Sequence, residues 1–351
     1  MGDHALSGKT LTAASSHPMG EAGSFPGFLE NRASVFAPRL SARPEWLLAV
    51  PSPIGWEGQG EGLLFPMNPY TKFVCDYARL VNEAKAFPLG GFPPVPRPEL
   101  ASDTPRALFF APHPDDETIV GALALRLLRE ARMNLINVAV TQGSKKERQA
   151  GRLAELKNAC NYLGFGVQTT IPNGLEKVTA RTRQNEPQLW ASMVKVVADI
   201  LSKHSPRVIL FPHERDWNGT HIGVHHLVMD ALQQMSASFA CFLIETEFWG
   251  AMDDPNLLVE VSAEDLADLI AATTFHVGEV ERNPYHVLLP AWMMDNVRRG
   301  AELVGGQGGA APDFTFAALY RLRQWSEGRV TNVLDRGKFL SKSENPASLF
   351  G

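Results

Sequence analysis

The strongest constraint on the fold is an alternation of short apolar segments with longer segments of helical spacing, which begins at Arg106. Apolar runs of strand length occur at 107–111, 135–140, 208–211, 239–245 and 257–261. Segments with helical spacing occur at 118–131, 146–163, 189–203, 222–235, 263–272 and 293–303. Continuous apolar strands that alternate with helices are typical of a mostly parallel sheet with helices on both faces. In such sheets, ligands bind at the carboxyl ends of the strands.

The N-terminal part of the chain follows a different pattern, because 14 of the 25 prolines lie at or before Pro105. We interpret residues 1–104 as an irregular Pro-rich extension with one helix near 70–86. We expect it to pack on the main domain or on another subunit, because aromatic residues such as Trp46 and Trp56 would otherwise be exposed. Residues 105–330 are then a Rossmann-like α/β domain, and residues 331–351 a C-terminal tail.

Composition and charge exclude several classes of protein. The chain has 33 basic and 38 acidic residues, a net charge of -5 and no basic run, so a nucleic-acid partner is not expected. No stretch is long and apolar enough for a membrane span, and the start lacks the order of a secretory signal, which predicts a cytoplasmic protein. Three widely spaced cysteines, Cys75, Cys160 and Cys241, argue against disulfides and thiolate zinc sites. A homo-oligomer is compatible with all of this.

The first apolar strand runs directly into the sequence Pro-His-Pro-Asp-Asp-Glu, residues 112–117, and a helix follows. His113 and Asp116 are three residues apart across this turn and can face one point. An imidazole, a carboxylate and a second imidazole form an ordinary ligand set for catalytic zinc. The simpler alternative is that Asp115 or Asp116 caps the helix. The crowding of four such residues in one turn favours a functional site.

A second polar cluster follows the apolar strand at 208–211 and contains His213, Asp216 and His221, with His225 and His226 beyond it. His221 and His225 are four residues apart and share a helix face, so a two-histidine pair competes with a single ligand at His221. Asp216 also suits a turn or a helix cap. Both clusters are expected at the same edge of the sheet, which predicts a metal site there.

The segment from Ala111 to Glu117 resembles the AHPDDE signature of the LmbE-like, or PIG-L-type, zinc-dependent N-acetylglucosamine deacetylase family. Residues 218–221, Asn-Gly-Thr-His, resemble the His-Pro-Asp-His-like box of that family in altered form. Further similarity lies in Thr-Gln-Gly at 141–143, in Arg152 and Glu155, and in Pro-Asn-Gly at 172–174. The resemblance covers about residues 105–325.

The resemblance implies that His113, Asp116 and His221 bind Zn²⁺, although another divalent transition metal is compatible with these ligands. It implies that Asp115 is the general base and that Arg152 orients the substrate. The expected activity is removal of the acetyl group from a small N-acetylated sugar or sugar conjugate by water that the metal activates. For Arg152 the alternative is an exposed helical partner of Glu155.

The chain departs from the family pattern at Asn218, where the family carries a histidine that stabilises the oxyanion or acts as an acid. An asparagine can donate a hydrogen bond but cannot transfer a proton, so the acid is protonated Asp115 or another histidine. The candidate histidines are His213, His225, His276 and His286. The departure leaves two alternatives: an amidase of the same family that acts on a non-sugar or thiol-conjugate amide, and a binding module that has lost catalysis.

Overall fold

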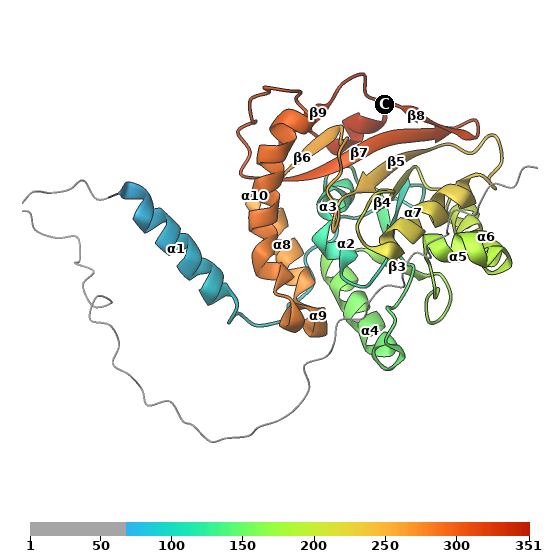
Figure 1. Ribbon diagram of the computed structural model, residues 1–351, viewed down its shortest axis with the longest axis horizontal. Helices are drawn as coiled ribbons and strands as arrows, with labels where there is room; N and C mark the ends of the chain where they lie inside the picture. The colour runs from blue at the N-terminus through green and yellow to red at the C-terminus, as the bar shows by residue number, and fades with distance from the viewer. Residues whose placement is uncertain (1–67) are drawn as a thin grey trace, which may run out of the picture. The chain divides into compact units, whose positions relative to one another are not determined.

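The computed structural model describes residues 68–351, which lie within one compact unit. Its strands form a single sheet in the order β3-β2-β1-β4-β5-β7-β6-β9, and β8 pairs with β7 (Figure 1). The strands are β1 (Arg106–Ala111), β2 (Asn134–Ala139), β3 (Gly166–Thr169), β4 (Val208–Pro212), β5 (Cys241–Thr246), β6 (Leu257–Val261), β7 (Phe316–Ser326), β8 (Arg329–Asn332) and β9 (Lys338–Leu340). The fold is therefore α/β with a mostly parallel sheet, as the sequence predicts.

The parallel half of the sheet sets the position of the polar turns. β1 pairs with β2 on one side and with β4 on the other, both in parallel, with Ala107 opposite Val208. Because β1 and β4 are neighbours that run in the same direction, their carboxyl ends lie at the same edge. The turns that follow Ala111 and Pro212 are therefore adjacent, although they are far apart in the sequence.

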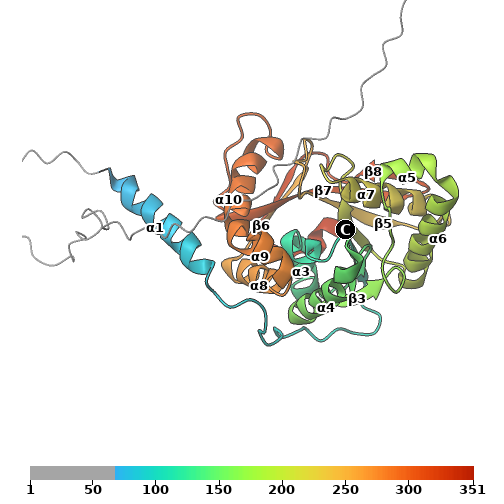
Figure 2. The same cartoon turned by 60° about the horizontal axis from the view of Figure 1, so that its bottom comes forward.

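Helices cover both faces of the sheet. Alternate residues of β1 point to opposite sides: Phe109 joins a core with the helices α3, α4, α8 and α10, and Phe110 joins a core with α6 and α7. Figure 2 shows these two groups of helices separately. The helices are α1 (Pro69–Ala84), α2 (Asp116–Ile119), α3 (Ala122–Arg129), α4 (Lys146–Leu163), α5 (Ala180–Asn185), α6 (Pro187–His204), α7 (Gly219–Leu232), α8 (Ala263–Thr273), α9 (Val277–Arg282) and α10 (Tyr285–Leu303), with a 3₁₀ helix η2 (Pro346–Phe350).

Two helices differ from the sequence-based expectation. The helix expected at 118–131 is divided into α2 and α3, and the break falls at Gly121, where a Cβ atom would lie only 2.1 Å from the carbonyl oxygen of Glu117. The chain can approach itself this closely only because residue 121 is glycine. The helix expected at 293–303 is the second half of α10, which continues through Pro290.

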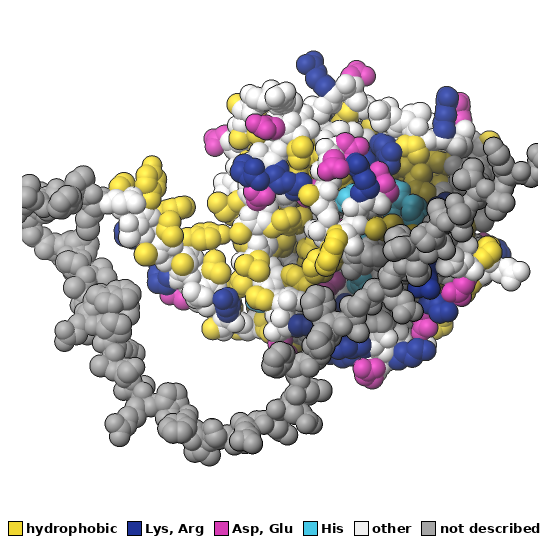
Figure 3. Space-filling view, viewed as in Figure 1, with side chains coloured by type: hydrophobic (Ala, Val, Ile, Leu, Met, Phe, Trp, Pro, Cys, Tyr) yellow, Lys and Arg dark blue, Asp and Glu magenta, His cyan; other side chains and the backbone are white. Residues whose placement is uncertain are grey.

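The N-terminal extension is described only from residue 68, so Trp46 and Trp56 lie outside the described residues. α1 is the expected helix, and it buries no residue: Tyr70, Phe73 and Leu80 are each more than half exposed, and Figure 3 shows hydrophobic side chains gathered over it. Residues 88–104 contact the domain, for example through the Val95 N–H, which donates to the Tyr162 carbonyl.

The segment expected to be a C-terminal tail is instead part of the domain. β9 pairs in parallel with β6, and Leu340, Leu349 and Phe350 are buried in the main core. The expectation of a tail was wrong because β9 has only three residues, too few to show a strand pattern in the sequence. Among the helices of residues 68–351, none is long and apolar enough to cross a membrane.

Candidate active site

Three side chains converge at the edge of the sheet where β1 and β4 end. His113 follows β1, Asp116 begins α2, and His221 lies in the first turn of α7. Asp116 and His221 are each only 2% exposed. Asp116 Oδ2 lies 3.4 Å from His221 Nε2 and 3.6 Å from His113 Nδ1. The structure therefore brings together the three residues that the resemblance implied as metal ligands.

The three residues fit a divalent metal ion. Zinc binds nitrogen and oxygen ligands at about 2.0–2.1 Å, so tetrahedral ligand atoms lie about 3.4 Å apart, close to the separations observed here. Asp116 Oδ1 and His221 Nε2 are buried and have no hydrogen-bond partner among the described residues. A buried polar atom without a partner is costly, and a bound cation would satisfy both atoms. The donor set and the free atoms thus support a metal cofactor.

Neighbouring groups fix the orientation of these ligands. The His113 backbone N–H donates to Asp116 Oδ2 over 2.8 Å. On the other side, Asp216 Oδ2 lies 3.5 Å from His221 Nδ1, and the Asp216 carboxylate accepts the backbone N–H groups of Asn218 and Trp249. A carboxylate at Nδ1 leaves Nε2 of His221 for the metal. From the sequence, Asp216 was expected only as a turn or cap residue, and its contact with His221 was not predicted.

The charges of the site favour an ionised carboxylate. Burial raises the pKa of Asp116, but the charge of His221 and the charge and hydrogen bond of His113 outweigh burial and lower it far below its ordinary value. Burial lowers the pKa of His221, but Asp116 and Asp216 outweigh it and raise this pKa to about 10. Asp116 is therefore negatively charged at neutral pH.

Asp115 has an unusual backbone conformation and faces the cleft beside these residues. Its φ of 121° and ψ of -30° lie outside the ordinary regions for a residue with a side chain, which costs about 1–3 kcal/mol. Asp115 occupies the N-cap position of α2, but its side chain makes no capping hydrogen bond to the first turn of that helix. Burial, and then the charge of Asp116, raise the pKa of Asp115 well above its ordinary value.

Asn218 is the N-cap of α7 and also lines the cleft. Its Oδ1 accepts the backbone N–H of Thr220 over 2.8 Å and that of His221 over 3.4 Å. The cap accounts for the oxygen of the carboxamide, and the Nδ2 group makes no hydrogen bond with the described residues. Asn218 was predicted from the sequence only as a hydrogen-bond donor, and its role as the N-cap of α7 was not predicted.

Arg152 of α4 is mostly buried beside the first polar turn. Its guanidinium donates to the carbonyl of Pro114 over 2.9 Å and lies 3.9 Å from the Asp115 carboxylate. The alternative of an exposed partner for Glu155 does not hold, because Arg152 is 13% exposed and Glu155 pairs with Arg148.

The cleft in front of Asp115 has a volume of about 440 Å³. Its wall includes three aromatic rings, those of Trp217, Trp249 and Tyr285, and adjacent rings are 6.2 and 6.1 Å apart. Its other lining residues are His113, Asp115, Gln142, Ser144, Lys145, Arg148, Arg152, Asn218, Gly278, Glu279, Arg282 and Asn283. The aromatic wall was not predicted from the sequence, because its residues come from three separate segments: the turn after β4, the loop after β5 and the start of α10. A second hollow of about 390 Å³ shares His113 and Ser144 with the cleft.

None of the four candidate acid histidines lines the cleft or the second hollow in the described part of the chain. His213 Nε2 donates to the Gly250 carbonyl, and His225 Nδ1 lies 3.0 Å from the Pro212 carbonyl. His276 Nε2 lies 2.7 Å from the Glu117 carboxylate, and His286 lines an apolar groove between α1, α8 and α10.

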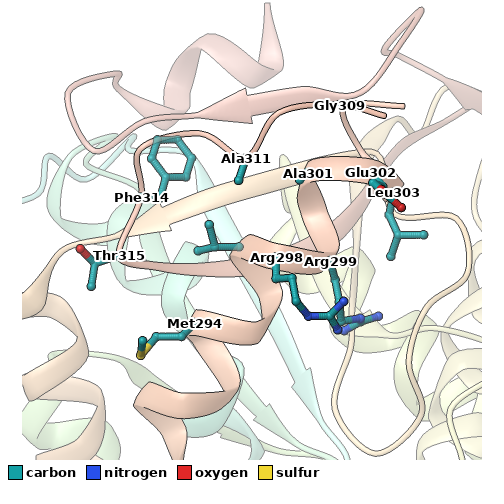
Figure 4. A pocket seen from close by; sticks show the side chains of 11 residues that line it. Met294, Arg298, Arg299, Ala301, Glu302, Leu303, Gly309, Ala311, Phe314 and Thr315 are labelled. Carbon is teal, nitrogen blue, oxygen red and sulfur yellow. The ribbon is translucent and has the colours of Figure 1, made fainter. Parts of the chain in front are cut away.

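A second cluster of possible metal ligands and another large hollow also resemble functional sites, but neither offers the side chains that such a site needs. Glu214, His225 and Glu245 lie close enough to hold a metal, but both carboxylates already pair with arginines: Arg321 pairs with each of them, and Arg323 pairs with Glu245. A wider hollow of about 940 Å³ lies beside α10, where its wall includes Arg298 and Phe314 (Figure 4). It contains none of the converging site residues.

Comparisons with known proteins found one family model and several solved structures that are similar to this chain. The model of the family PIG-L, GlcNAc-PI de-N-acetylase, matches residues 108–232, whereas no curated protein matches the chain in sequence. Among solved structures, the conserved protein TT1542 from Thermus thermophilus is 17% identical with a TM-score of 0.47, over 62% of this chain and 94% of that one. The N,N'-diacetylchitobiose deacetylase from Pyrococcus horikoshii is 15% identical with a TM-score of 0.46, over 71% and 92%. GalB, the 4-carboxy-2-hydroxymuconate hydratase from Pseudomonas putida, is 15% identical with a TM-score of 0.46, over 62% and 96%.

The matched residues include both polar turns of the site. The match begins inside β1, passes through His113 and Asp116, and ends at the last residue of α7, which carries His221. The chain therefore contains a domain of the PIG-L family of de-N-acetylases.

Proposed function

We propose that this chain is a zinc-dependent hydrolase that removes the acetyl group from an N-acetylated amino sugar or sugar conjugate. The observation that carries the proposal is the convergence of His113, Asp116 and His221, with Asp116 Oδ1 and His221 Nε2 unpaired among the described residues, beside the cleft-facing carboxylate of Asp115. Residues 105–330, together with β9 and η2, form the catalytic domain in this proposal.

The residues of the site divide the chemistry among them. A divalent ion held by the three ligands would polarise the acetamide carbonyl and lower the pKa of a water molecule. Asp115 takes a proton from the attacking water, and its placement at the cleft gives it access to that proton. Asn218 Nδ2 donates a hydrogen bond to the carbonyl oxygen as negative charge develops on it. Arg152 holds the loop of Asp115 and orients the substrate.

The proton that the leaving amine needs comes from Asp115 in this proposal. The four other candidate histidines are paired or lie away from the cleft, whereas Asp115 lines it. A carboxylate that has taken the proton of the water can return it to the nitrogen when the C–N bond breaks. The three rings of the cleft wall offer apolar faces to the C–H face of a sugar ring.

The test uses the full chain, stripped of metal by a chelator and reloaded with Zn²⁺. Acetate release is measured on N-acetylglucosamine, an N-acetylglucosamine conjugate, an S-conjugate of N-acetylcysteine and a simple N-alkylacetamide. We expect zinc-dependent release from the sugars, and a loss of about 100-fold or more in Asp115→Asn with bound zinc retained. Zinc-dependent turnover of the non-sugar amides alone would refute the sugar substrate and support the amidase of the same family.

A binding module without catalysis is the second candidate, because Asn218 stands where the family pattern carries a histidine and an asparagine cannot transfer a proton. In that case the wild-type chain releases no acetate from any of the four compounds while still binding zinc. Turnover that appears only in Asn218→His would support this second candidate.

A further inference from the structure

Glu117, the last residue of the first polar turn, is fully buried and does not line the cleft. Its Oε2 accepts the backbone N–H of Asp115 over 3.0 Å, and its Oε1 lies 2.7 Å from Nε2 of His276. A buried carboxylate is unfavourable unless its oxygens are hydrogen-bonded, and here both are. The two carboxylate oxygens of Glu117 are therefore hydrogen-bonded to the backbone N–H of Asp115 and to the side chain of His276.

The backbone of Asp115 needs this support. Its φ of 121° is rare for a residue other than glycine, and such a conformation persists only when the surroundings hold it. In the described part of the chain, no backbone carbonyl accepts the Asp115 N–H, so Glu117 is its acceptor. The conformation also decides where the Asp115 side chain points, because the Cα–Cβ direction follows from φ and ψ.

His276 holds Glu117 from another part of the fold. It lies 159 residues further along the chain, is 0% exposed and immediately precedes α9. α9 contributes Glu279 and Arg282 to the cleft. His276 lines neither the cleft nor the second hollow, so it does not contact the substrate.

We propose that the buried Glu117–His276 pair is a positioning device that holds Asp115 in its strained conformation and so aims its carboxylate into the cleft. The inference rests on the proposed function, in which Asp115 is the general base. Glu117 and His276 are positioning residues in this scheme: they act on the reaction through Asp115, and His276 also joins the base to the α9 wall of the cleft.

The variants His276→Leu and His276→Asn test the proposal. Leucine keeps the volume and has no donor, whereas asparagine is polar but too short to reach the Glu117 carboxylate. Both should retain bound zinc and lower kcat for acetate release by about 100-fold, because a misplaced group costs that much. KM should change by less than about threefold, since His276 does not touch the substrate. His276→Gln, which can donate to Glu117, should recover most of the lost kcat.

The matched control is His286→Leu, which removes another buried histidine, at the apolar groove away from the site. It should leave kcat and zinc content unchanged. Unchanged kcat in His276→Leu or His276→Asn, or the same loss of kcat in His286→Leu, would overturn the proposal.

Hydrogen exchange separates this inference from the proposed function. The Asp115 amide proton is donated to a buried acceptor, so its exchange should be slow in the wild type and faster in His276→Asn, but not in His286→Leu. If the wild type releases no acetate but exchange changes in this way, the proposed function fails and the positioning of Asp115 stands. If the wild type is active and exchange at Asp115 is the same in all variants, the positioning proposal fails alone.

Discussion

Asn218 has two roles that one substitution would confuse, and a matched pair of variants separates them. As the N-cap of α7, its Oδ1 makes one good hydrogen bond, of 2.8 Å, and one marginal one, of 3.4 Å. Removing such a cap costs about 1 kcal/mol of stability. In the proposed function, its Nδ2 donates to the developing oxyanion, and the loss of one such donor lowers kcat about 100- to 1,000-fold.

The stability cost of the lost cap is too small to account for the expected loss of kcat. A domain with an unfolding free energy of about 5–15 kcal/mol stays almost fully folded after a loss of about 1 kcal/mol. The lost cap therefore changes the melting temperature by only a few degrees and cannot explain a loss of kcat of about 100-fold. Asn218→Ala should show both effects. Asn218→Asp keeps an acceptor at the cap but has no N–H donor, so it should regain stability and not kcat.

The assay measures zinc content and thermal unfolding of the wild type and both variants at one pH, and acetate release over a range of pH. The acidic limb of the pH-rate profile should persist in Asn218→Ala, because an asparagine does not titrate. The reasoning is refuted if Asn218→Ala retains wild-type kcat in an active enzyme. It is equally refuted if Asn218→Asp restores kcat together with stability, since the cap would then account for the whole effect.

Three further predictions concern the ligands, the cleft and an ion pair. His113→Ala and His221→Ala should each lose most bound zinc, whereas His225→Ala should keep it; elemental analysis that gives the reverse order would contradict the ligand assignment. Arg152→Ala should raise KM more than it lowers kcat, and an unchanged KM in steady-state kinetics would exclude substrate binding. Burial raises the pKa of Glu214, but its partner Arg321 outweighs burial and lowers this pKa from 4.5 to about 2. The Glu214–Arg321 ion pair therefore stabilises the fold above pH 4.5, and this stabilisation is lost as the pH falls toward 2. Urea unfolding should show Glu214→Gln less stable than the wild type by about 1 kcal/mol at pH 7, with a smaller difference at pH 3; an equal difference at both would exclude the ion pair as the cause.

The sequence predicts those parts of the fold in which local pattern and tertiary environment agree. β1 and β4 are continuous apolar runs because both of their faces are buried, and each is followed by a polar turn that contributes to the candidate site. β7 is missed because Arg321 and Arg323 interrupt its apolar pattern. Both arginines lie opposite β5, where they pair with Glu245, and this partner is visible only once the strands are placed together.

In the site, too, the sequence predicts what a local motif determines and does not predict what depends on tertiary packing. His113 and Asp116 come from one turn, so their proximity follows from the sequence. The aromatic wall and His276 come from segments whose positions depend on how β5, α9 and α10 pack, and a single sequence carries no local signal for that packing. The backbone conformation of Asp115 is equally invisible, because aspartate gives no sign of a positive φ.

Helical spacing alone does not show whether His221 or His225 faces the candidate metal site. Their positions along the axis of α7 decide between them. Residues four apart share a face, but they differ by about one turn, or about 5.4 Å, along the axis. His221 lies in the first turn, at the level of Asp116, and its Nε2 has no partner among the described residues. His225 lies one turn further on, where its Nδ1 is 3.0 Å from the carbonyl of Pro212 at the end of β4. Since the neutral ring donates there and burial lowers the pKa of His225, this histidine supports the turn that follows β4 and does not face the metal ligands.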